Sequence, residues 1–401
     1  MTQRLVYLDH SATTPVDPEV VEAMLPWLRE HFGNASSLHA WGRRARVAVE
    51  EAREEIAALI GAHPSELVFT SGGTEANNAI IKSCCVESRL TDTVVYSAIE
   101  HHAVIHPAEA LAEQGFRTAV LPVDSSGRVR VEEVTAWNRP RTLISVMHAN
   151  NETGVIQPIE AIRAAAPDAL LHTDAVQSFG KIPVNVRQLG VDFASFSAHK
   201  IHGPKGIGAM YIRRGIPFKA HQHGGSQERN RRAGTEPVAL IVGFQVAARK
   251  AISQLEQRAQ RMRQLSQLLR QLLQERIPGV LFNTPEDGVL PNIVNITFAD
   301  AAALDGDALI LGMDFYGVAV SNGSACTAGS MQPSHVLLAM GRTPAQARAA
   351  IRFSLSHETT EDDIRYAVEA LERVLKPMRE RRPTGYTPAA ARSETLSQSA
   401  P

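Results

Sequence analysis

A lysine and an aspartate follow two apolar runs that we expect to be neighbouring strands. Lys200 comes after residues 193–197 and precedes a turn rich in Gly and Pro, and Asp174 closes residues 170–173. Adjacent parallel strands end at the same edge of a sheet, so these side chains would lie close together. A positioned amine can form a Schiff base, and a carboxylate keeps a pyridinium nitrogen protonated. The pair indicates pyridoxal phosphate chemistry, although each residue alone is more often an ordinary strand-end residue.

A glycine-containing loop offers a place for a phosphate group. Residues 70–78 read Thr-Ser-Gly-Gly-Thr-Glu-Ala-Asn-Asn and connect an expected strand to an expected helix, with Gly73 and Thr74 at the helix start. Backbone N–H groups at a helix N-terminus attract anions. An ordinary strand-to-helix turn could have the same composition, so the loop indicates a phosphate site only in combination with Lys200 and Asp174.

The chain has three cysteines, and we expect only one to be reactive. Cys326 lies in a segment of small residues, Ser-Asn-Gly-Ser-Ala-Cys-Thr-Ala-Gly-Ser at 321–330, where a thiol would be accessible. Cys84 and Cys85 lie on an expected helix, and at least one should be buried as a small apolar residue. Three cysteines, two of them adjacent, exclude a disulfide scaffold, a four-cysteine zinc site and an iron–sulfur cluster bound by this chain alone.

Helical and strand patterns alternate along the chain, which predicts helices covering a mostly parallel sheet. Residues 43–60 form an amphipathic pattern that stops at Gly61. Short apolar runs ending in small or polar residues predict buried strands. These runs are residues 67–70, 94–97, 143–147, 170–173, 193–197 and 209–212.

A second, smaller lobe is expected after a long helical pattern from Val238 to about Ile277. Strand-like segments at 293–298, 317–320 and 351–355 and a final helix at about 360–375 would build this lobe. The predicted organisation is an N-terminal segment packing with the small domain (1–15), a large cofactor-binding domain (16–255), a small α+β domain (256–376) that carries the cysteine loop (about 321–333), and a flexible tail (377–401).

Composition narrows the classes of partner and compartment. The 401 residues are 44% hydrophobic, and 41 Lys and Arg nearly balance 42 Asp and Glu, so neither nucleic acid nor an anionic membrane is an expected partner. No apolar run approaches the roughly 20 residues of a membrane span, and charges interrupt the first ten residues, so we expect a cytoplasmic protein. His199, His202, His221 and His223 lack a matching acidic or thiol set, so no metal site is expected.

Seven motifs follow one another along the chain. They are Ser-Gly-Gly-Thr-Glu-Ala-Asn-Asn at 71–78, Glu-His-His-Ala-Val at 100–104, His-Ala-Asn-Asn-Glu-Thr-Gly at 148–154, Asp-Ala-Val-Gln at 174–177, Ser-Ala-His-Lys at 197–200, Arg-Ala-Gly-Thr at 232–235 and Ser-Ala-Cys-Thr at 324–327. Their order and approximate spacing are those of NifS/IscS-type cysteine desulfurases, and this sequence therefore resembles that family from about residue 5 to about residue 375.

The resemblance implies the fold-type I architecture of pyridoxal phosphate enzymes, with a large domain built on a mostly parallel seven-stranded sheet. It also implies a homodimer with active sites at the subunit boundary. Lys200 would hold the cofactor as a Schiff base, Asp174 would pair with the pyridine nitrogen, and Gln177 would bond the phenolic oxygen. His101 would lie against the ring and take part in proton transfer; we prefer it to His102, which we expect to begin a helix.

The phosphate and the substrate also acquire expected partners from the resemblance. Gly73, Thr74, Ser197 and His199 would hold the phosphate, together with Thr235 of the partner subunit. Asn151 and Arg352 would orient the substrate, Arg352 by gripping its carboxylate. Strand alternation places Arg352 opposite Ile351 and Phe353, although without the resemblance an exposed arginine that binds nothing would be favoured.

The implied activity is conversion of L-cysteine to L-alanine. Lys200 would move the Cα proton, Cys326 would take the sulfur as a persulfide, and an acceptor such as an iron–sulfur scaffold would receive it. Alternatives are a selenocysteine lyase or a related fold-type I aminotransferase or lyase in which Cys326 contributes little, and a non-catalytic pyridoxal-phosphate-binding partner in sulfur transfer. The acceptor and the pathway stay open, and the tail after residue 377 does not resemble the scaffold-binding end of some family members.

Overall fold

A seven-stranded sheet organises the larger part of the computed structural model, which describes residues 4–322 and 332–380. In spatial order the strands are β2 (Leu67–Thr70), β8 (Gly208–Ile212), β7 (Phe193–Ser197), β6 (Leu170–Asp174), β5 (Thr142–Ser145), β3 (Thr93–Ser97) and β4 (Arg117–Leu121). Neighbouring strands are parallel except for the two antiparallel pairs that β8 makes. The predicted α/β class is confirmed. Apolar runs predict every strand of this sheet except β4, which is a half-exposed edge strand with few buried residues.

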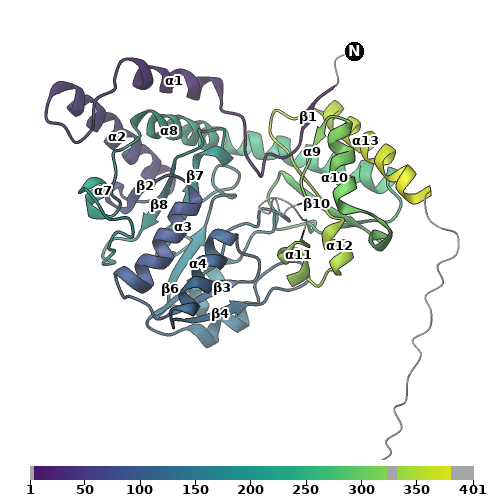
Figure 1. Cartoon of the computed structure of the whole chain (residues 1–401), viewed down its shortest axis with the longest axis horizontal. Helices are drawn as coiled ribbons and strands as arrows, with labels where there is room; N and C mark the ends of the chain where they lie inside the picture. Colours follow the sequence, from purple (N-terminus) through teal and green to yellow (C-terminus); the bar gives the residue numbers. More distant parts are fainter. Residues whose placement is uncertain (1–3, 323–331, 381–401) are drawn as a thin grey trace, which may run out of the picture.

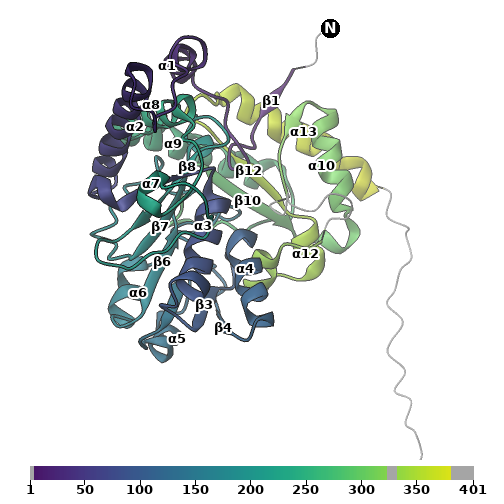
Figure 2. The ribbon, with the colours of Figure 1, turned by 60° about the vertical axis from the view of Figure 1, so that its left-hand side comes forward.

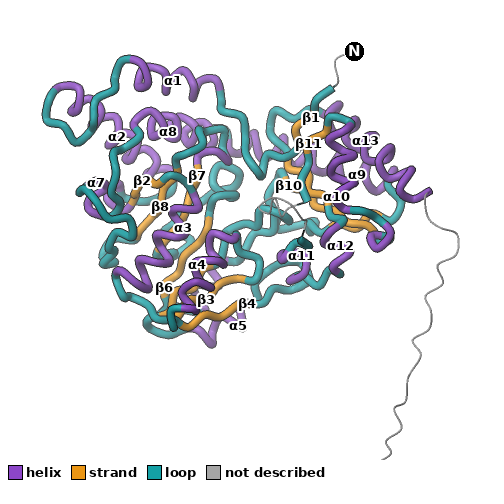
Figure 3. The backbone as a smooth tube through the Cα atoms, viewed as in Figure 1, coloured by secondary structure: helices purple, strands orange, loops and turns teal. Residues whose placement is uncertain are grey.

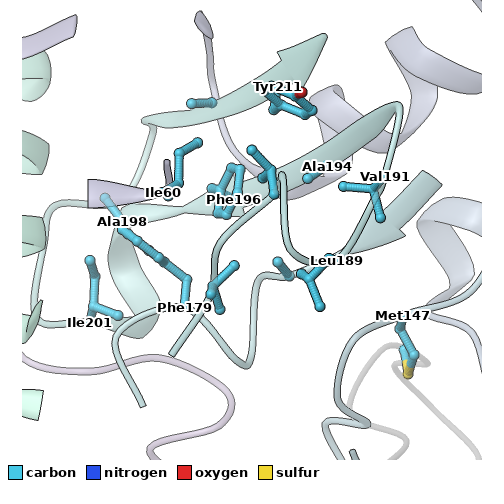
Figure 4. Packing of buried hydrophobic residues seen from close by; sticks show 14 of the residues in the cluster. Ile60, Met147, Phe179, Leu189, Val191, Ala194, Phe196, Ala198, Ile201 and Tyr211 are labelled. Atoms are coloured by element: carbon cyan, nitrogen blue, oxygen red, sulfur yellow. The ribbon is translucent and has the colours of Figure 1, made fainter. Parts of the chain in front are cut away.

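Helices cover both faces of this sheet (Figure 1). Side chains of successive strand residues point to opposite faces. Phe69 therefore belongs to a core that includes residues of α2 (Ala40–Leu59) and α8 (Val238–Ser253), whereas Val68 belongs to a core that includes residues of α3 (Gly73–Lys82) and α4 (His102–Glu113). Phe179 and Phe196 meet edge to face in the core that also contains Phe69, with ring centroids 5.2 Å apart (Figure 4). Close packing on both faces holds the strand ends in place, which a site built on those ends requires.

Further helices complete the large lobe, which comprises the elements packed around the seven-stranded sheet. They are α1 (Pro18–Arg29), α5 (Val131–Val134), α6 (Ile159–Ala165) and α7 (Gln227–Asn230). The amphipathic pattern predicted at 43–60 corresponds to α2, and Gly61 follows it with φ of +71°, the left-handed conformation that glycine adopts without strain.

Cys84 and Cys85 lie in a short π-helical turn, Ser83–Glu87, directly after α3. Both thiols are buried in the core between α3, α4 and the sheet. Burial raises the pKa of both thiols, most strongly that of Cys84. A buried thiol with a raised pKa is a poor nucleophile, so the expected packing role is confirmed for both.

The long helical pattern after Val238 forms two helices rather than one. α8 ends at Ser253, α9 (Leu255–Arg276) follows, and the pair is bent by 71°. We propose that the lobe boundary, predicted near residue 255, lies at this bend. Within the described residues, no single helix has the length and apolar character needed to cross a membrane. The bent pair of α8 and α9, taken together, is the one combination there whose length and composition would be sufficient.

The small lobe has a core of its own, which contains residues of α9, α10 (Gly306–Phe315) and α13 (Glu361–Glu380) (Figure 2). Its antiparallel sheet has the order β12 (Ile351–Ser354), β10 (Ile293–Phe298) and β9 (Val280–Phe282). The short helices α11 (His335–Ala339) and α12 (Pro344–Arg348) join the two lobes, because their buried residues Val336, Leu337 and Ala347 lie in the large-lobe core. Figure 3 shows these strands set apart from those of the large lobe.

The N-terminal segment joins the small lobe. β1 (Val6–Tyr7) pairs in parallel with β11 (Val318–Ala319), and Leu8 is fully buried in the small-lobe core. The chain then crosses to the large lobe, where the backbone N–H of Thr14 donates to the carbonyl of His199. Residues 8–14 therefore connect the small-lobe core to the large lobe.

The final helix is longer than expected. α13 continues through Pro377 to Glu380, so residues 377–380 are helical and do not begin a tail. The side chain of Arg379 bonds Asp300 at 3.1 Å and the carbonyl of Pro278 at 2.9 Å, and these contacts extend the helix beyond its apolar pattern. The rest of the predicted tail, 381–401, lies outside the described residues.

Candidate active site

A cavity of about 370 Å³ lies at the carboxyl ends of β6 and β7. Its wall includes Ser11 and Ala12 from the N-terminal segment and Arg352 from the small lobe. Every site residue predicted from the sequence lines it, apart from Thr235 and Cys326: Gly73, Thr74, His101, Asn151, Asp174, Gln177, Ser197, His199, Lys200 and Arg352. Thr235 is exposed and does not line this cavity, and Cys326 lies outside the described residues.

Asp174 is the last residue of β6 and is 7% exposed. One carboxylate oxygen accepts the N–H of Val176 at 2.9 Å, and the other accepts the side-chain amide of Asn77 at 2.6 Å. These two donors fix the orientation of the carboxylate at the cavity wall. Asn77 was not singled out from the sequence, although it lies within the quoted glycine motif one helical turn after Gly73.

Lys200 ends a single helical turn, Ala198–Lys200, that directly follows β7. Its Nζ donates to the carbonyls of Ser11 and Ala12, each at 2.6 Å. Adjacent parallel strands thus bring Lys200 and Asp174 to one edge of the sheet, as predicted from the two strand ends. No local signal indicated Ser11 and Ala12, because they are nearly two hundred residues away in the sequence.

His101 caps the N-terminus of α4, and its Nδ1 accepts the N–H of Ala103 at 3.0 Å. In this arrangement any ring proton of the neutral imidazole is on Nε2. Burial lowers the pKa of His101, and Lys200 lowers it further, whereas Asp174 opposes the shift. The ring is therefore a neutral group able to accept or donate a proton in the cavity. His102 is the first residue of α4, as expected.

The N-terminus of α3 lies at the cavity wall, which Gly73 and Thr74 line. Its capping residue, Gly72, makes no side-chain cap. A Cβ at Gly73 would lie 2.6 Å from Val176 Cγ2, so only glycine lets the chain pass this close. Ser197 and His199 line the same cavity, and burial, with Lys200 next, lowers the pKa of His199 to about 4. These neutral hydroxyl, imidazole and N–H groups suit an anion such as phosphate.

Arg352 reaches the cavity from β12, while its neighbours Ile351 and Phe353 are in the small-lobe core, as strand alternation predicts. Its guanidinium donates to Asp9 Oδ1 at 2.6 Å and to the carbonyl of Asn151 at 3.1 Å. Its Nε has no hydrogen-bond partner among the described residues. The guanidinium is thus oriented from two sides, with donor capacity remaining for an anion.

Comparison with known proteins decides the family. The model of the aminotransferase class-V family matches residues 6–366. Cysteine desulfurase IscS of Dictyoglomus turgidum is 46% identical over 94% of this chain and 96% of its own length, and a cysteine desulfurase of Gluconacetobacter diazotrophicus is 44% identical over 97% and 98%. The chain belongs to the class-V aminotransferases. Within that family it is a cysteine desulfurase of the NifS/IscS type, as its motifs predict.

Solved structures show the same relationship for this desulfurase. A NifS-like protein superimposes with a TM-score of 0.86 at 39% identity, covering 93% of this chain and all of the other. A NifS-like protein from Rickettsia africae gives 0.84 at 33% identity, with the same coverage. A third structure, SspA in complex with cysteine, gives 0.77 at 36% identity over 90% of this chain and all of the other. The fold-type I architecture is therefore confirmed.

Two buried carboxyl groups of the desulfurase line the cavity without having been assigned a role from the sequence. Glu100 is fully buried, burial raises its pKa well above the usual range, and its Oε1 accepts the N–H of Met147 at 2.6 Å. Burial likewise raises the pKa of Glu152 to about 7, while Ser334 and Arg352 oppose the shift. Both residues lie inside the family motifs, but only their burial in the folded chain reveals that the charged form of each carboxyl group is disfavoured.

Proposed function

We propose that this cysteine desulfurase converts L-cysteine to L-alanine with pyridoxal phosphate in the cavity, and passes the sulfur to Cys326 as a persulfide. The observation that carries the proposal is the convergence of Lys200, Asp174, His101 and Arg352 on one cavity from four separate elements. An amine, a carboxylate, an imidazole and a guanidinium are the groups that amino-acid chemistry on this cofactor needs. The solved relative described as SspA in complex with cysteine supports the choice of substrate.

The cavity fits the cofactor that the class-V family uses. We assign its phosphate to the N-terminus of α3 at Gly73 and Thr74 together with Ser197 and His199, and its pyridine nitrogen to Asp174. Gln177 would donate to its phenolic oxygen and Lys200 would hold its aldehyde. When bound, pyridoxal phosphate withdraws electrons from the substrate and makes the Cα proton acidic.

Three side chains would bind the substrate or transfer its protons. Arg352 would bind its carboxylate through the donors left over from Asp9 and Asn151, and so orient the Cα–H bond. Lys200, as a free amine, would take the Cα proton. His101, neutral because of its burial, would exchange a proton with the substrate at Nε2.

Sulfur transfer would then occur at Cys326. The thiolate of Cys326 attacks the substrate sulfur, so that a sulfur–sulfur bond forms while the Cβ–sulfur bond breaks, and the three-carbon fragment takes up a proton and leaves as alanine. A thiol of the acceptor, such as an iron–sulfur scaffold, attacks the persulfide and carries the outer sulfur away. A reducing compartment such as the cytoplasm keeps the emptied thiol free for the next cycle.

We further propose a homodimer. Thr235 is exposed and is absent from the cavity wall of its own chain, although its motif matches a phosphate-binding segment of the family. In a dimer, Thr235 of the partner subunit would complete the phosphate site. The two active sites would then depend on assembly, because each lacks one ligand in a single chain.

Incubation of the purified holoenzyme with L-cysteine tests the proposed function. We expect one alanine for each sulfur released, and a mass increase of one sulfur atom on the peptide that contains Cys326. Addition of a reducing thiol should remove the extra sulfur and restore the peptide mass. Pyruvate in place of alanine, or sulfur found on Cys84 or Cys85 instead, would contradict the proposal.

Replacement of Arg352 by lysine should weaken substrate binding more than it slows the chemistry. Lysine keeps the charge but loses the planar fork that can hold a carboxylate by two bonds. We expect the KM for L-cysteine to rise roughly tenfold or more, since one charged hydrogen bond contributes about 1.5–3 kcal/mol. Steady-state kinetics measure this, with the exposed Arg348→Lys variant as the control. An unchanged KM would show that Arg352 does not bind the carboxylate.

A further inference from the structure

Lys181 is a buried lysine next to the cofactor cavity that the proposed reaction does not use. It follows Gly180 in the loop after β6 and is 6% exposed. Lysine is rarely buried without a carboxylate partner, because desolvation of its charge is costly. Among the described residues Lys181 has no ion pair; its Nζ donates to the backbone carbonyl of Gln177 at 2.9 Å and to Gln177 Oε1 at 3.3 Å.

The bonds on either side of Gln177 determine which way its side-chain amide points. When protonated, Lys181 can only donate, so the amide oxygen of Gln177 faces it. The carbonyl of Ser11 can only accept, so the amide nitrogen faces Ser11, at 2.9 Å. A primary amide has two N–H groups, and Ser11 uses one. Because Gln177 also lines the cavity, the other N–H is available as a donor there.

The surroundings of Lys181 are cationic or neutral. Lys200 lies close enough to lower the pKa of Lys181 further, after burial, to about 7. His10, His199 and His202 also feel the charge of Lys181, and burial keeps each of them neutral. A small cavity of about 30 Å³ beside Lys181 has room for a water molecule, and its other titratable lining groups are Lys200, His10, His202, Arg258 and His357. Burial lowers the pKa of His357 to about 4, so it too is neutral, whereas Arg258 adds positive charge. Among the described residues, no carboxylate forms an ion pair with Lys181.

We propose that Lys181 is a positioning residue for the cofactor: it holds the Gln177 amide with its N–H toward the cavity, and its positive charge behind that amide favours a negative phenolic oxygen on the bound pyridoxal phosphate. The inference rests on the proposed function, since it requires that the cofactor occupies this cavity. Burial and Lys200 hold the pKa of Lys181 at about 7 before the cofactor binds. A negative phenolic oxygen would favour the protonated amine, because nearby opposite charges stabilise the charged form of each group.

A double-mutant cycle on cofactor affinity tests the first half of the proposal. Apoprotein is titrated with pyridoxal phosphate and the visible absorption band is recorded. We expect Lys181→Met and Gln177→Leu each to weaken binding roughly threefold to tenfold, and the double variant to bind no more weakly than the worse single variant. Wild-type affinity in Lys181→Met, or effects that multiply in the double variant, would overturn it. The exposed Lys205→Met variant is the matched control and should bind as the wild type does.

The second half is tested with Lys181→Gln, whose amide can still donate to Gln177 Oε1 but carries no charge. Loss of the cation should let the cofactor keep its proton to higher pH, so the pH midpoint of the visible band should rise by about half a unit or more. An unchanged midpoint would overturn the role of the charge. This variant also serves if Lys181→Met does not fold, as judged by circular dichroism. Failure of the wild-type apoprotein to bind pyridoxal phosphate would contradict the proposed function. If the wild type binds the cofactor and the Lys181 variants bind and titrate as it does, the inference about Lys181 is wrong and the proposed function stands.

Discussion

Cys326→Ala is expected to lower sulfur release from L-cysteine by roughly a thousandfold or more, while cofactor affinity stays the same. The large loss follows because the variant has no nucleophile to take the sulfur, and removal of a covalent catalyst is among the most severe changes an active site can undergo. Affinity is expected to be unchanged because none of the groups assigned to the cofactor involves Cys326. The measurements are sulfide and alanine production, and titration of the visible band.

Cys84→Ala provides the matched control for that variant. Cys84 is fully buried, and burial raises the pKa of its thiol, so its loss should change stability slightly and leave the rate of the folded enzyme unchanged. Undiminished desulfuration by Cys326→Ala would contradict the persulfide mechanism. It would favour a selenocysteine lyase or a related lyase in which this thiol contributes little.

Lys200→Ala is expected to abolish both the reducible visible band of the bound cofactor and the production of alanine. The band depends on a covalent bond between the cofactor aldehyde and a lysine amine, and the same amine is proposed to move the Cα proton. We expect the rate to fall by roughly a thousandfold or more, since two functions are lost at once. Absorption spectra before and after borohydride treatment, and peptide mass analysis, measure the outcome.

Two other lysines make this result specific. Lys205→Ala removes an exposed lysine only five residues away and should leave the spectrum unchanged. Lys181 also lies close to the cavity, but both of its hydrogen bonds go to Gln177. A reducible band that persists in Lys200→Ala, with cofactor attached to a Lys181 peptide, would show that the lysine assignment is wrong.

The large-lobe strands other than β4, and the positions of Lys200 and Asp174, were predictable from local patterns. Buried parallel strands are short apolar runs, and the chemistry collects where they end, so reading the ends of β6 and β7 was enough to place both residues at one edge. The bend between α8 and α9 was not predictable in the same way, because both sides of it have the same helical periodicity. The four helical residues of α13 after Lys376 also depend on contacts with a distant segment.

Long-range neighbours explain what sequence reasoning missed at the site. Asp9 lies 343 residues from the guanidinium of Arg352 that it orients, and no local pattern links them. Glu100 and Glu152 were visible in motifs, yet nothing in their spacing shows that burial raises their pKa. A pKa shift depends on the solvent and charges around a group, and these exist only after the lobes have packed.

The sequence by itself determined the α/β class, the family and the types of group available for chemistry, because periodicity, strand ends and ordered motifs are properties of the linear chain. Only the tertiary structure decided which of those groups face one cavity and in what state. It placed the N-terminal segment against Lys200, set Asp9 on Arg352, and left Lys181 buried with Gln177 as its hydrogen-bond partner. These features arise from contacts between residues far apart in the chain, where burial and hydrogen-bond geometry control charge.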